Sequence, residues 1–303
     1  MITSFDRRLP SGHVLNGKWN RNRYEVVRRL GSGANGAVFL VQREKTEYAL
    51  KIGFDAVDHQ SEINVLADLS GREGAFSGYL KDVDDVLIEG ETYPFYVMKY
   101  VRGVSLRDYV RLKGADWLSL AGLRLLSRLN ELHKQGWIFS DLKADNVLVS
   151  GYGEAELVDY GGVTAKGRAV RQFTEIHDRA YWHAGSRTAD EGYDLFAFAV
   201  LCLQLAAPDA ACFSSRMLPQ NRSVEVLLEE VRLQPACRPY RDFLRKALLG
   251  QFPSSELARQ TWKDAVYGIK EKPAGVVRSL RWLHAGFAAS LGIGLWAFYL
   301  YLT

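Results

Sequence analysis

The sequence predicts an α+β fold in which an antiparallel, β-rich first part is followed by a helical second part and then by one apolar helix. Short runs of β-branched and aromatic residues, separated by turn residues, fill the region 20–100. Longer runs with apolar residues at helical spacing fill the region 101–262. Residues 285–302 contain no charged residue, and a run of that length is close to the shortest helix that spans a bilayer.

Composition excludes few functions. A chain of 303 residues with 48% hydrophobic and 24% charged residues is typical of a globular protein and allows one bilobal domain or two small ones. A net charge of +4 permits phosphates or anionic lipids as partners but does not by itself indicate nucleic-acid binding. The cysteines, Cys202, Cys212 and Cys237, have neither disulfide nor metal-ligand spacing, which predicts buried thiols in a reducing compartment. The N-terminus lacks the apolar segment of a secretory signal.

Three strands are expected near the N-terminus, after an irregular polar arm at residues 1–19. They lie at residues 24–30, 37–41 and 47–52, where β-branched and aromatic residues are frequent. Two more strands are expected at residues 83–88 and 95–101. Together they predict an antiparallel sheet.

The turn between the first two strands has the spacing G-x-G-x-x-G, formed by Gly31, Gly33 and Gly36. Dinucleotide-binding folds share this spacing, but they place a helix after the glycines. Here a strand follows, and Val38 extends the pattern to G-x-G-x-x-G-x-V. Glycine suits such a turn because a side chain would hold the backbone away from a bound phosphate. The turn is therefore predicted to cover phosphate groups.

Lys51 ends the third strand, and a helix is predicted at residues 60–69 with Glu62 in its first turn. A buried lysine that binds α- and β-phosphates needs a carboxylate partner, which Glu62 supplies. The alternative for Lys51 is a solvated side chain at the edge of a strand.

The segment 137–149 has the pattern of a strand, a polar loop and a second strand. Its loop presents a carboxylate, an ammonium and a carboxamide, from Asp141, Lys143 and Asn146. Phosphoryl transfer uses these groups as proton acceptor, as cation for the moving phosphoryl group and as magnesium ligand. Asp159, in the triplet Asp159-Tyr160-Gly161, would return a second carboxylate to the same site.

Together these motifs resemble the eukaryotic-like protein kinases, whose catalytic loop reads D-L-K-x-x-N and whose metal-binding triplet is usually D-F-G. The resemblance covers residues 20–262 and implies a bilobal protein-kinase fold, with an N-lobe at residues 20–100 and a C-lobe at residues 101–262. It implies ATP and Mg²⁺ as cofactors, with Asn146 and Asp159 as metal ligands. The residues implied for phosphate transfer are Lys51, Glu62, Asp141 and Lys143.

The same resemblance implies a nucleotide pocket. Met98 would lie behind the adenine ring, and the backbone of Lys99 and Val101 would bind its edge. The implied nucleotide-binding residues are Gly31, Gly33, Gly36, Val38, Ala49, Lys51, Met98, Lys99, Val101 and Leu148.

Helices are expected throughout the C-lobe, at residues 105–110, 118–133, 193–201, 224–233, 241–249 and 255–269. Asp194 matches the aspartate that ties the start of a buried helix to the catalytic loop in this family, and His133 is expected to be structural.

A narrower resemblance is to the YabT-type membrane-anchored sporulation kinases of spore-forming Gram-positive bacteria, which join a kinase domain through a basic linker to one membrane helix. The stretches that carry this resemblance are residues 17–20, 33–36, 135–139, 178–182 and 193–197.

Three departures from the family pattern affect the expectations. The usual H-R-D is Phe139-Ser140-Asp141. No arginine therefore stands beside the base to bind a phosphate on the activation segment, which the resemblance places at residues 161–192. Activation by loop phosphorylation is therefore not expected, although Thr164 and Thr174 are candidate autophosphorylation sites. D-F-G is Asp159-Tyr160-Gly161, which keeps the carboxylate. A-P-E has no clear counterpart, and residues 184–186 and 189–191 are both candidates.

The region 263–282 is a predicted juxtamembrane linker with a basic excess, from Lys263, Lys270, Lys272, Arg278 and Arg281. It is interpreted either as a solvated linker or as a strip on anionic lipid, where each close charge contributes about 1 kcal/mol. Weak DNA binding through this linker and self-association for trans-activation are further hypotheses.

Residues 283–302 are predicted to form a transmembrane helix with aromatic residues near both ends. The alternative is a buried C-terminal helix of the domain. Positive charge before the apolar run predicts a single-pass protein of the cell membrane with its kinase domain in the cytoplasm.

The sequence thus predicts a serine/threonine protein kinase that transfers the γ-phosphate of ATP to protein hydroxyls at the cytoplasmic membrane. The serine/threonine preference rests on Lys143, two residues after Asp141, as in that branch of the family. The alternative is a pseudokinase or nucleotide-binding scaffold. An active enzyme is favoured because all six polar positions are filled, by Lys51, Glu62, Asp141, Lys143, Asn146 and Asp159.

Overall fold

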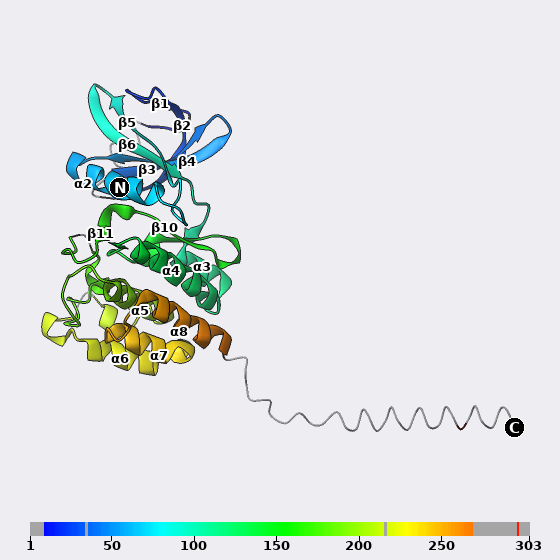
Figure 1. The fold of residues 1–303 in the computed structure, drawn as a ribbon, viewed down its shortest axis with the longest axis vertical. Coiled ribbons are helices and arrows are strands. Elements are labelled where there is room, and N and C mark those ends of the chain that lie inside the picture. Colours follow the sequence, from blue (N-terminus) through cyan, green and yellow to red (C-terminus); the bar gives the residue numbers. More distant parts are fainter. Residues whose placement is uncertain (1–8, 34–35, 172, 215–216, 269–295, 297–303) are drawn as a thin grey trace. The chain divides into compact units, whose positions relative to one another are not determined.

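The computed structural model describes residues 9–33, 36–171, 173–214, 217–268 and 296. The chain divides into two units, Met1–Val266 and Tyr267–Thr303. The first unit contains a β-rich lobe and a helical lobe (Figure 1). The predicted transmembrane helix at 283–302, apart from Trp296, and the linker beyond residue 268 lie outside the described residues. Within the part that is described, no helix combines the length and the apolar character needed to cross a membrane.

The N-lobe is built on one antiparallel sheet of six strands, which confirms the predicted antiparallel start. The strand order is β1-β2-β3-β4-β6-β5. The strands are β1 (Val14–Asn16), β2 (Arg23–Gly33), β3 (Gly36–Arg43), β4 (Thr46–Gly53), β5 (Leu80–Ile88) and β6 (Glu91–Lys99). Because β6 ends at Lys99, Val101 lies beyond the strand that was predicted to include it.

Part of the predicted arm at residues 1–19 is a strand instead of an irregular segment. β1 pairs with β2, and Gly17 forms a bridge with Val86 of β5, so the arm joins the two edges of the sheet. Leu15 is buried, and Asp84 of β5 accepts the backbone N–H groups of Trp19 and Asn20. The polar composition that indicated a loose arm therefore reflects polar contacts between the arm and β5.

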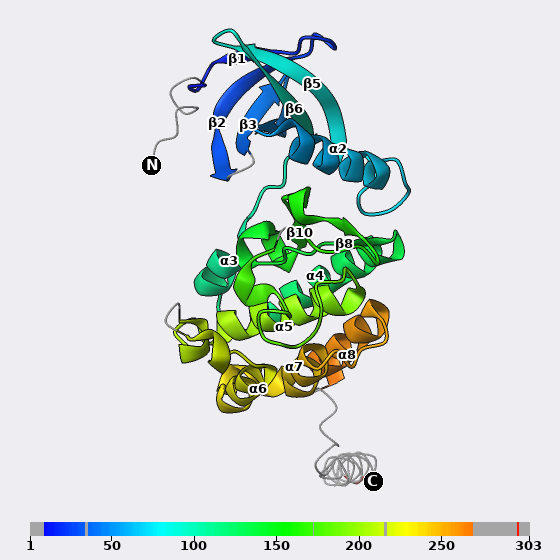
Figure 2. The same ribbon diagram turned by 90° about the vertical axis from the view of Figure 1, so that its left-hand side faces the viewer.

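Helix α2 (Ala56–Ser70) lies on the side of the sheet that faces the helical lobe (Figure 2). It begins four residues earlier than predicted because Asp55 caps its N-terminus, accepting the N–H groups of Val57 and Asp58. Glu62 is consequently in its second turn. In the sheet, Lys51 of β4 is paired with Val38 of β3 and with Tyr96 of β6.

The C-lobe is helical, as predicted. Its helices are α3 (Leu106–Lys113), α4 (Trp117–Lys134), α5 (Glu191–Ala206), α6 (Val224–Leu233), α7 (Arg241–Leu248) and α8 (Ser255–Tyr267). Residues 193–203 of α5 are all buried, so this helix forms the centre of the lobe. Trp262 of α8 is buried against Tyr240, Phe198 and Phe243. Because α8 continues to Tyr267, the first residues of the predicted linker are helical.

Short strands enclose the catalytic loop. β8 (Trp137–Ile138) precedes the loop and pairs with β11 (Thr164–Ala165). β9 (Val147–Val149) follows the loop and pairs with β7 (Val104–Ser105) and β10 (Ala155–Leu157). The predicted sequence of strand, loop and strand is confirmed, and both ends of the loop are held by backbone hydrogen bonds.

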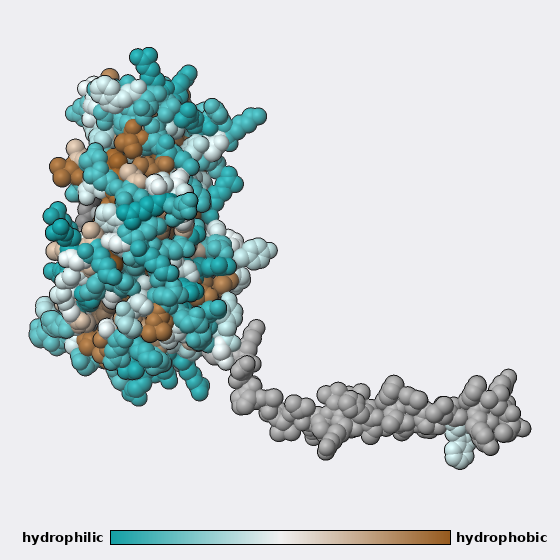
Figure 3. Space-filling view, viewed as in Figure 1, coloured by the Kyte–Doolittle hydropathy of each residue, from teal (hydrophilic) through white to brown (hydrophobic). Residues whose placement is uncertain are grey.

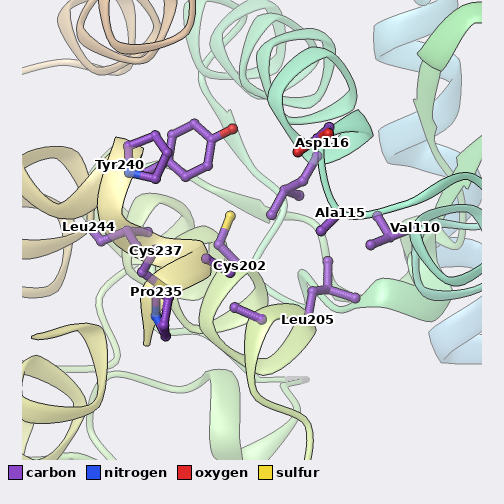
Figure 4. A pocket seen from close by; sticks show the side chains of 13 residues that line it. Val110, Ala115, Asp116, Cys202, Leu205, Pro235, Cys237, Tyr240 and Leu244 are labelled. Carbon is purple, nitrogen blue, oxygen red and sulfur yellow. The ribbon is translucent and has the colours of Figure 1, made fainter. Parts of the chain in front are cut away.

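The C-lobe also contains a cavity of about 250 Å³ away from the residues predicted for catalysis. Mostly apolar side chains line it, from α3, α4, α5 and α7 and from the segment Pro235–Tyr240, and they include Cys202 and Cys237 (Figure 4). All three cysteines are free and buried, and burial raises the pKa values of Cys212 and Cys237 to about 11. The outer surface in Figure 3 is mostly hydrophilic over the described part of that face.

Candidate active site

The catalytic loop is anchored by Asp194, which lies in the first turn of α5. Its carboxylate accepts the backbone N–H groups of Phe139 at 2.7 Å and Ser140 at 2.8 Å, and it contacts His133 Nε2 at 2.8 Å. Asp194 is fully buried, so these three contacts replace its hydration. Ser140 has a left-handed backbone with φ 69°, which turns the chain sharply just before Asp141. The structure thus places Asp194 and His133 where the family resemblance implied.

Asp141 is the centre of a small hydrogen-bond network. Its Oδ2 accepts Lys143 Nζ at 2.6 Å and Asn146 Nδ2 at 3.2 Å. Asn146 Nδ2 also donates to the Asp141 carbonyl at 2.9 Å. Because the amide nitrogen of Asn146 points into the loop, its oxygen is the atom that remains for a cation. Gly162 packs on this network: a Cβ there would lie 2.9 Å from Asp141 Cβ, so only glycine allows the approach.

Lys51 lies between two carboxylates. Its Nζ contacts both oxygens of Glu62, at 2.9 and 2.7 Å, and Asp159 Oδ1 at 3.0 Å. Lys51 and Glu62 are buried, whereas the Asp159 side chain is about half exposed. Burial alone would lower the pKa of Lys51, but Glu62 and Asp159 outweigh it and raise this pKa. Burial would raise the pKa of Asp159, but Lys51 and Lys143 reverse the effect and lower it. Lys51 and Asp159 are therefore charged at neutral pH.

The triplet Asp159-Tyr160-Gly161 combines a left-handed residue with a buried aromatic ring. Asp159 has a left-handed conformation with φ 63°. The next residue, Tyr160, is buried, and its ring contacts those of Phe139 and Tyr79 at centroid distances of 6.1 and 5.4 Å. The Tyr160 hydroxyl donates to the Leu157 carbonyl at 3.2 Å. The tyrosine that departs from D-F-G therefore keeps a buried ring and satisfies its extra hydroxyl.

The implied nucleotide-binding residues come from both lobes. Ala49 and Met98 are paired across β4 and β6 and are buried, while Val38, Val101 and Leu148 are half-buried. The Lys99 N–H donates to the Tyr79 carbonyl at 2.9 Å, so Lys99 has only its carbonyl to offer an adenine. Gly31 and Gly33 end β2, and Gly36 begins β3. The tip of this turn, residues 34–35, lies outside the described residues.

Two residues of the activation segment reach the catalytic loop in ways that sequence reasoning missed. The hydroxyl of Thr174 donates to Asp141 Oδ1 at 2.8 Å. His177 Nδ1 donates to the Leu142 carbonyl at 2.7 Å, and its Nε2 lies 3.3 Å from the side-chain amide of Gln204 on α5. Burial lowers the pKa of His177 to about 4, so the imidazole is neutral. No local spacing indicates these contacts, because each joins positions more than 25 residues apart.

The two candidate A-P-E stretches lie next to ion pairs formed within the activation segment. Arg179 contacts Asp190 at 2.7 Å and donates to the Ser186 carbonyl at 2.6 Å. Arg187 contacts the buried Asp178 at 2.7 Å. Asp190 also caps α5 by accepting the N–H of Tyr193. Arg179 is therefore connected to the start of α5 through Asp190, and Arg187 is held by the buried Asp178.

The structure brings the six predicted polar residues into one site, with Lys51, Glu62 and Asp159 on one side and Asp141, Lys143 and Asn146 on the other. Within the described parts of the chain, no cluster of three or more His, Cys, Asp or Glu could hold a metal ion. Mg²⁺ commonly binds through one or two protein ligands together with phosphate oxygens and water. Asn146 and Asp159 therefore fit a magnesium ion that arrives with a nucleotide.

Comparisons with known proteins agree with this geometry. The family description "Protein kinase domain" matches residues 24–236. The serine/threonine-protein kinase YabT of Bacillus subtilis (strain 168) is 36% identical over 268 residues, which cover 87% of this chain and 78% of YabT. The serine/threonine-protein kinases SMU1 of Mycosarcoma maydis and pak-1 of Caenorhabditis elegans are 25% and 26% identical over 60% of this chain. These alignments cover only 25% and 33% of those two proteins.

Proposed function

Because the chain belongs to the protein kinase family and is a serine/threonine kinase, we propose that the site on Asp141 and Lys51 uses magnesium-bound ATP to phosphorylate protein hydroxyls. The observation that supports this most is the pair of ion contacts from Lys51 to Glu62 and Asp159, assembled beside the Asp141 network. In phosphoryl transfer the lysine–glutamate pair and the metal-binding aspartate must both be in place.

Each residue has a distinct task in this proposal. Lys51, held by Glu62, binds the α- and β-phosphates. Asp141 orients the acceptor hydroxyl and takes its proton, and Lys143 contacts the γ-phosphate. Asn146 and Asp159 would hold magnesium, which neutralises charge on the β- and γ-phosphates. The hydroxyl attacks the γ-phosphorus while the bond to the β,γ-bridging oxygen breaks, which leaves ADP and a phosphoserine or phosphothreonine.

We expect the Thr174→Val substitution to lower kcat about tenfold, because Asp141 loses a hydrogen bond to its charged carboxylate. Thr174→Ser keeps the hydroxyl and should retain most of the activity. The assay is ATP-dependent phosphorylation of a mixed protein substrate, with the modified residues identified by mass spectrometry.

For the wild-type chain, the same assay is expected to yield phosphoserine and phosphothreonine but no phosphotyrosine. Nucleotide binding without any transfer would instead support the scaffold alternative.

The same assay, run on phosphatase-treated protein, tests whether the kinase works without a phosphorylated activation segment. Ser140 replaces the arginine that would bind such a phosphate, and the segment is already held by Thr174, His177 and the Asp178–Arg187 pair. Full activity after phosphatase treatment is expected. Activity that depends on a phosphate in this segment would contradict the proposal.

The apolar segment 283–302 is proposed to anchor the kinase in the cell membrane, with the basic linker on anionic lipid and the kinase domain in the cytoplasm. Its uncharged composition supports this. The full chain should float with anionic vesicles and resist a high-salt wash, whereas a chain ending at residue 268 should stay in solution. Release by salt would show that the linker alone binds the lipid.

Two further hypotheses have their own tests on the full chain. A gel shift tests DNA binding through the linker, and a measurement of the molecular mass in solution tests self-association.

A further inference from the structure

Glu62 has a second partner besides Lys51. The hydroxyl of Tyr96 on β6 donates to Glu62 Oε1 at 2.8 Å. Tyr96 is fully buried and is the direct cross-strand neighbour of Lys51. Directly paired residues of antiparallel strands project from the same face of a sheet. Two donors from adjacent strands therefore hold one carboxylate of α2.

His59 links the same tyrosine to the start of α2. It precedes Glu62 by three residues, so both lie on one face of the helix. Its ring packs on that of Tyr96 with a centroid distance of 5.1 Å and an interplanar angle of 32°. The ring also covers the end of β4: a Cβ on Gly53 would lie 2.4 Å from it. A glycine at position 53 is what allows the helix to approach this closely.

His59 contributes by packing and not by charge. It is buried, and neither ring nitrogen has a hydrogen-bond partner among the described residues. Burial and the nearby Lys51 lower its pKa to about 4, against a weaker opposing effect of Asp85. The imidazole is therefore neutral near pH 7.

The connection between β4 and α2 is also short. Only residues 54 and 55 separate the two elements, and Asp55 caps the helix.

We infer that Tyr96 and His59 are positioning residues that keep α2 where Glu62 pairs with Lys51. The inference rests on the proposed function of Lys51 as the phosphate-binding cation. Through Glu62, α2 is connected both to β4, by Lys51, and to β6, by Tyr96.

Tyr96→Phe tests the inference, since it removes the hydroxyl and keeps the ring on His59. Tyr79→Phe is a matched control: Tyr79 is also buried, and its hydroxyl has no partner in the described chain. Tyr96→Phe should lower kcat/KM for ATP about tenfold, with KM for the protein substrate within about twofold. Hydrogen exchange in α2 should become faster. Tyr79→Phe should change none of these quantities.

A double-mutant cycle with Glu62→Ala, which removes the acceptor of the Tyr96 hydroxyl, separates positioning from a general structural effect. If Tyr96 acts through Glu62, adding Tyr96→Phe to Glu62→Ala lowers kcat/KM by less than about twofold further. The inference would be overturned if the Tyr96→Phe variant had the kinetics and the hydrogen exchange of the wild type. It would also be overturned if the losses of kcat/KM in the two single variants multiplied in the double variant. If the wild-type chain transfers no phosphate, the proposed function fails. The role of Tyr96 can still be decided in that case, by comparing hydrogen exchange of α2 in the Tyr96→Phe variant with that in the Tyr79→Phe variant.

Discussion

Asp141→Asn is expected to lower the rate of phosphate transfer by about three orders of magnitude while the fold stays intact. Asparagine has the same shape as aspartate and its oxygen can still accept hydrogen bonds from Thr174 or Lys143. It cannot take a proton from the acceptor hydroxyl, because a neutral amide is a very weak base. Initial rates at saturating Mg²⁺ and ATP, with circular dichroism as a check on folding, measure this effect.

Asp145→Asn is the matched control for that experiment. Asp145 lies in the same loop, but its side chain is 63% exposed and its charged neighbour Arg107 is 3.8 Å away. The control should retain activity within about twofold, because exposed ion pairs of this kind contribute little. Equal activity of Asp141→Asn and wild type would remove Asp141 from the proposed mechanism.

Asp194→Asn is expected to lower the free energy of unfolding by about 3 kcal/mol and to abolish activity. The buried carboxylate accepts two backbone N–H groups and contacts His133, as described above. An asparagine amide would turn an N–H donor toward at least one of these donors, which leaves a buried polar group unsatisfied. The loop that carries Asp141 would lose its anchor, so activity is lost together with stability.

Urea unfolding of wild type and Asp194→Asn measures this loss. Asp209→Asn is a suitable control because Asp209 is exposed, and its free energy of unfolding should match that of wild type within about 0.5 kcal/mol. An Asp194→Asn protein as stable as wild type would mean that the Asp194 contacts do not hold the catalytic loop.

The fold, and the grouping of the six polar residues in one place, could be predicted because their signals are local. Strands and helices follow from periodicity within one element, and Asp141, Lys143 and Asn146 lie within a single loop. The signals that were missed join distant positions. Thr174 and His177 show no pattern of their own, and Tyr96 looks like any other core residue of an alternating strand. Residues 14–16 were expected to be irregular because the strand that completes their pairing lies beyond the turn that follows them.

The counterpart of A-P-E is a second feature that could not be predicted from the sequence. A family pattern can be matched only where the family residues are present, and this chain fastens its activation segment with Arg179–Asp190 and Arg187–Asp178 instead. The paired residues lie eleven and nine positions apart, and no sequence pattern used above pointed to either pair.

A crystal structure of the full kinase domain with Mg²⁺ and a non-hydrolysable ATP analogue tests the central claim most directly. The account predicts Lys51 on the α- and β-phosphates, magnesium bound by Asn146 and Asp159, and Asp141 facing the γ-phosphate. A nucleotide bound elsewhere, or one whose phosphates touch neither Lys51 nor a metal held by Asp159, would contradict it.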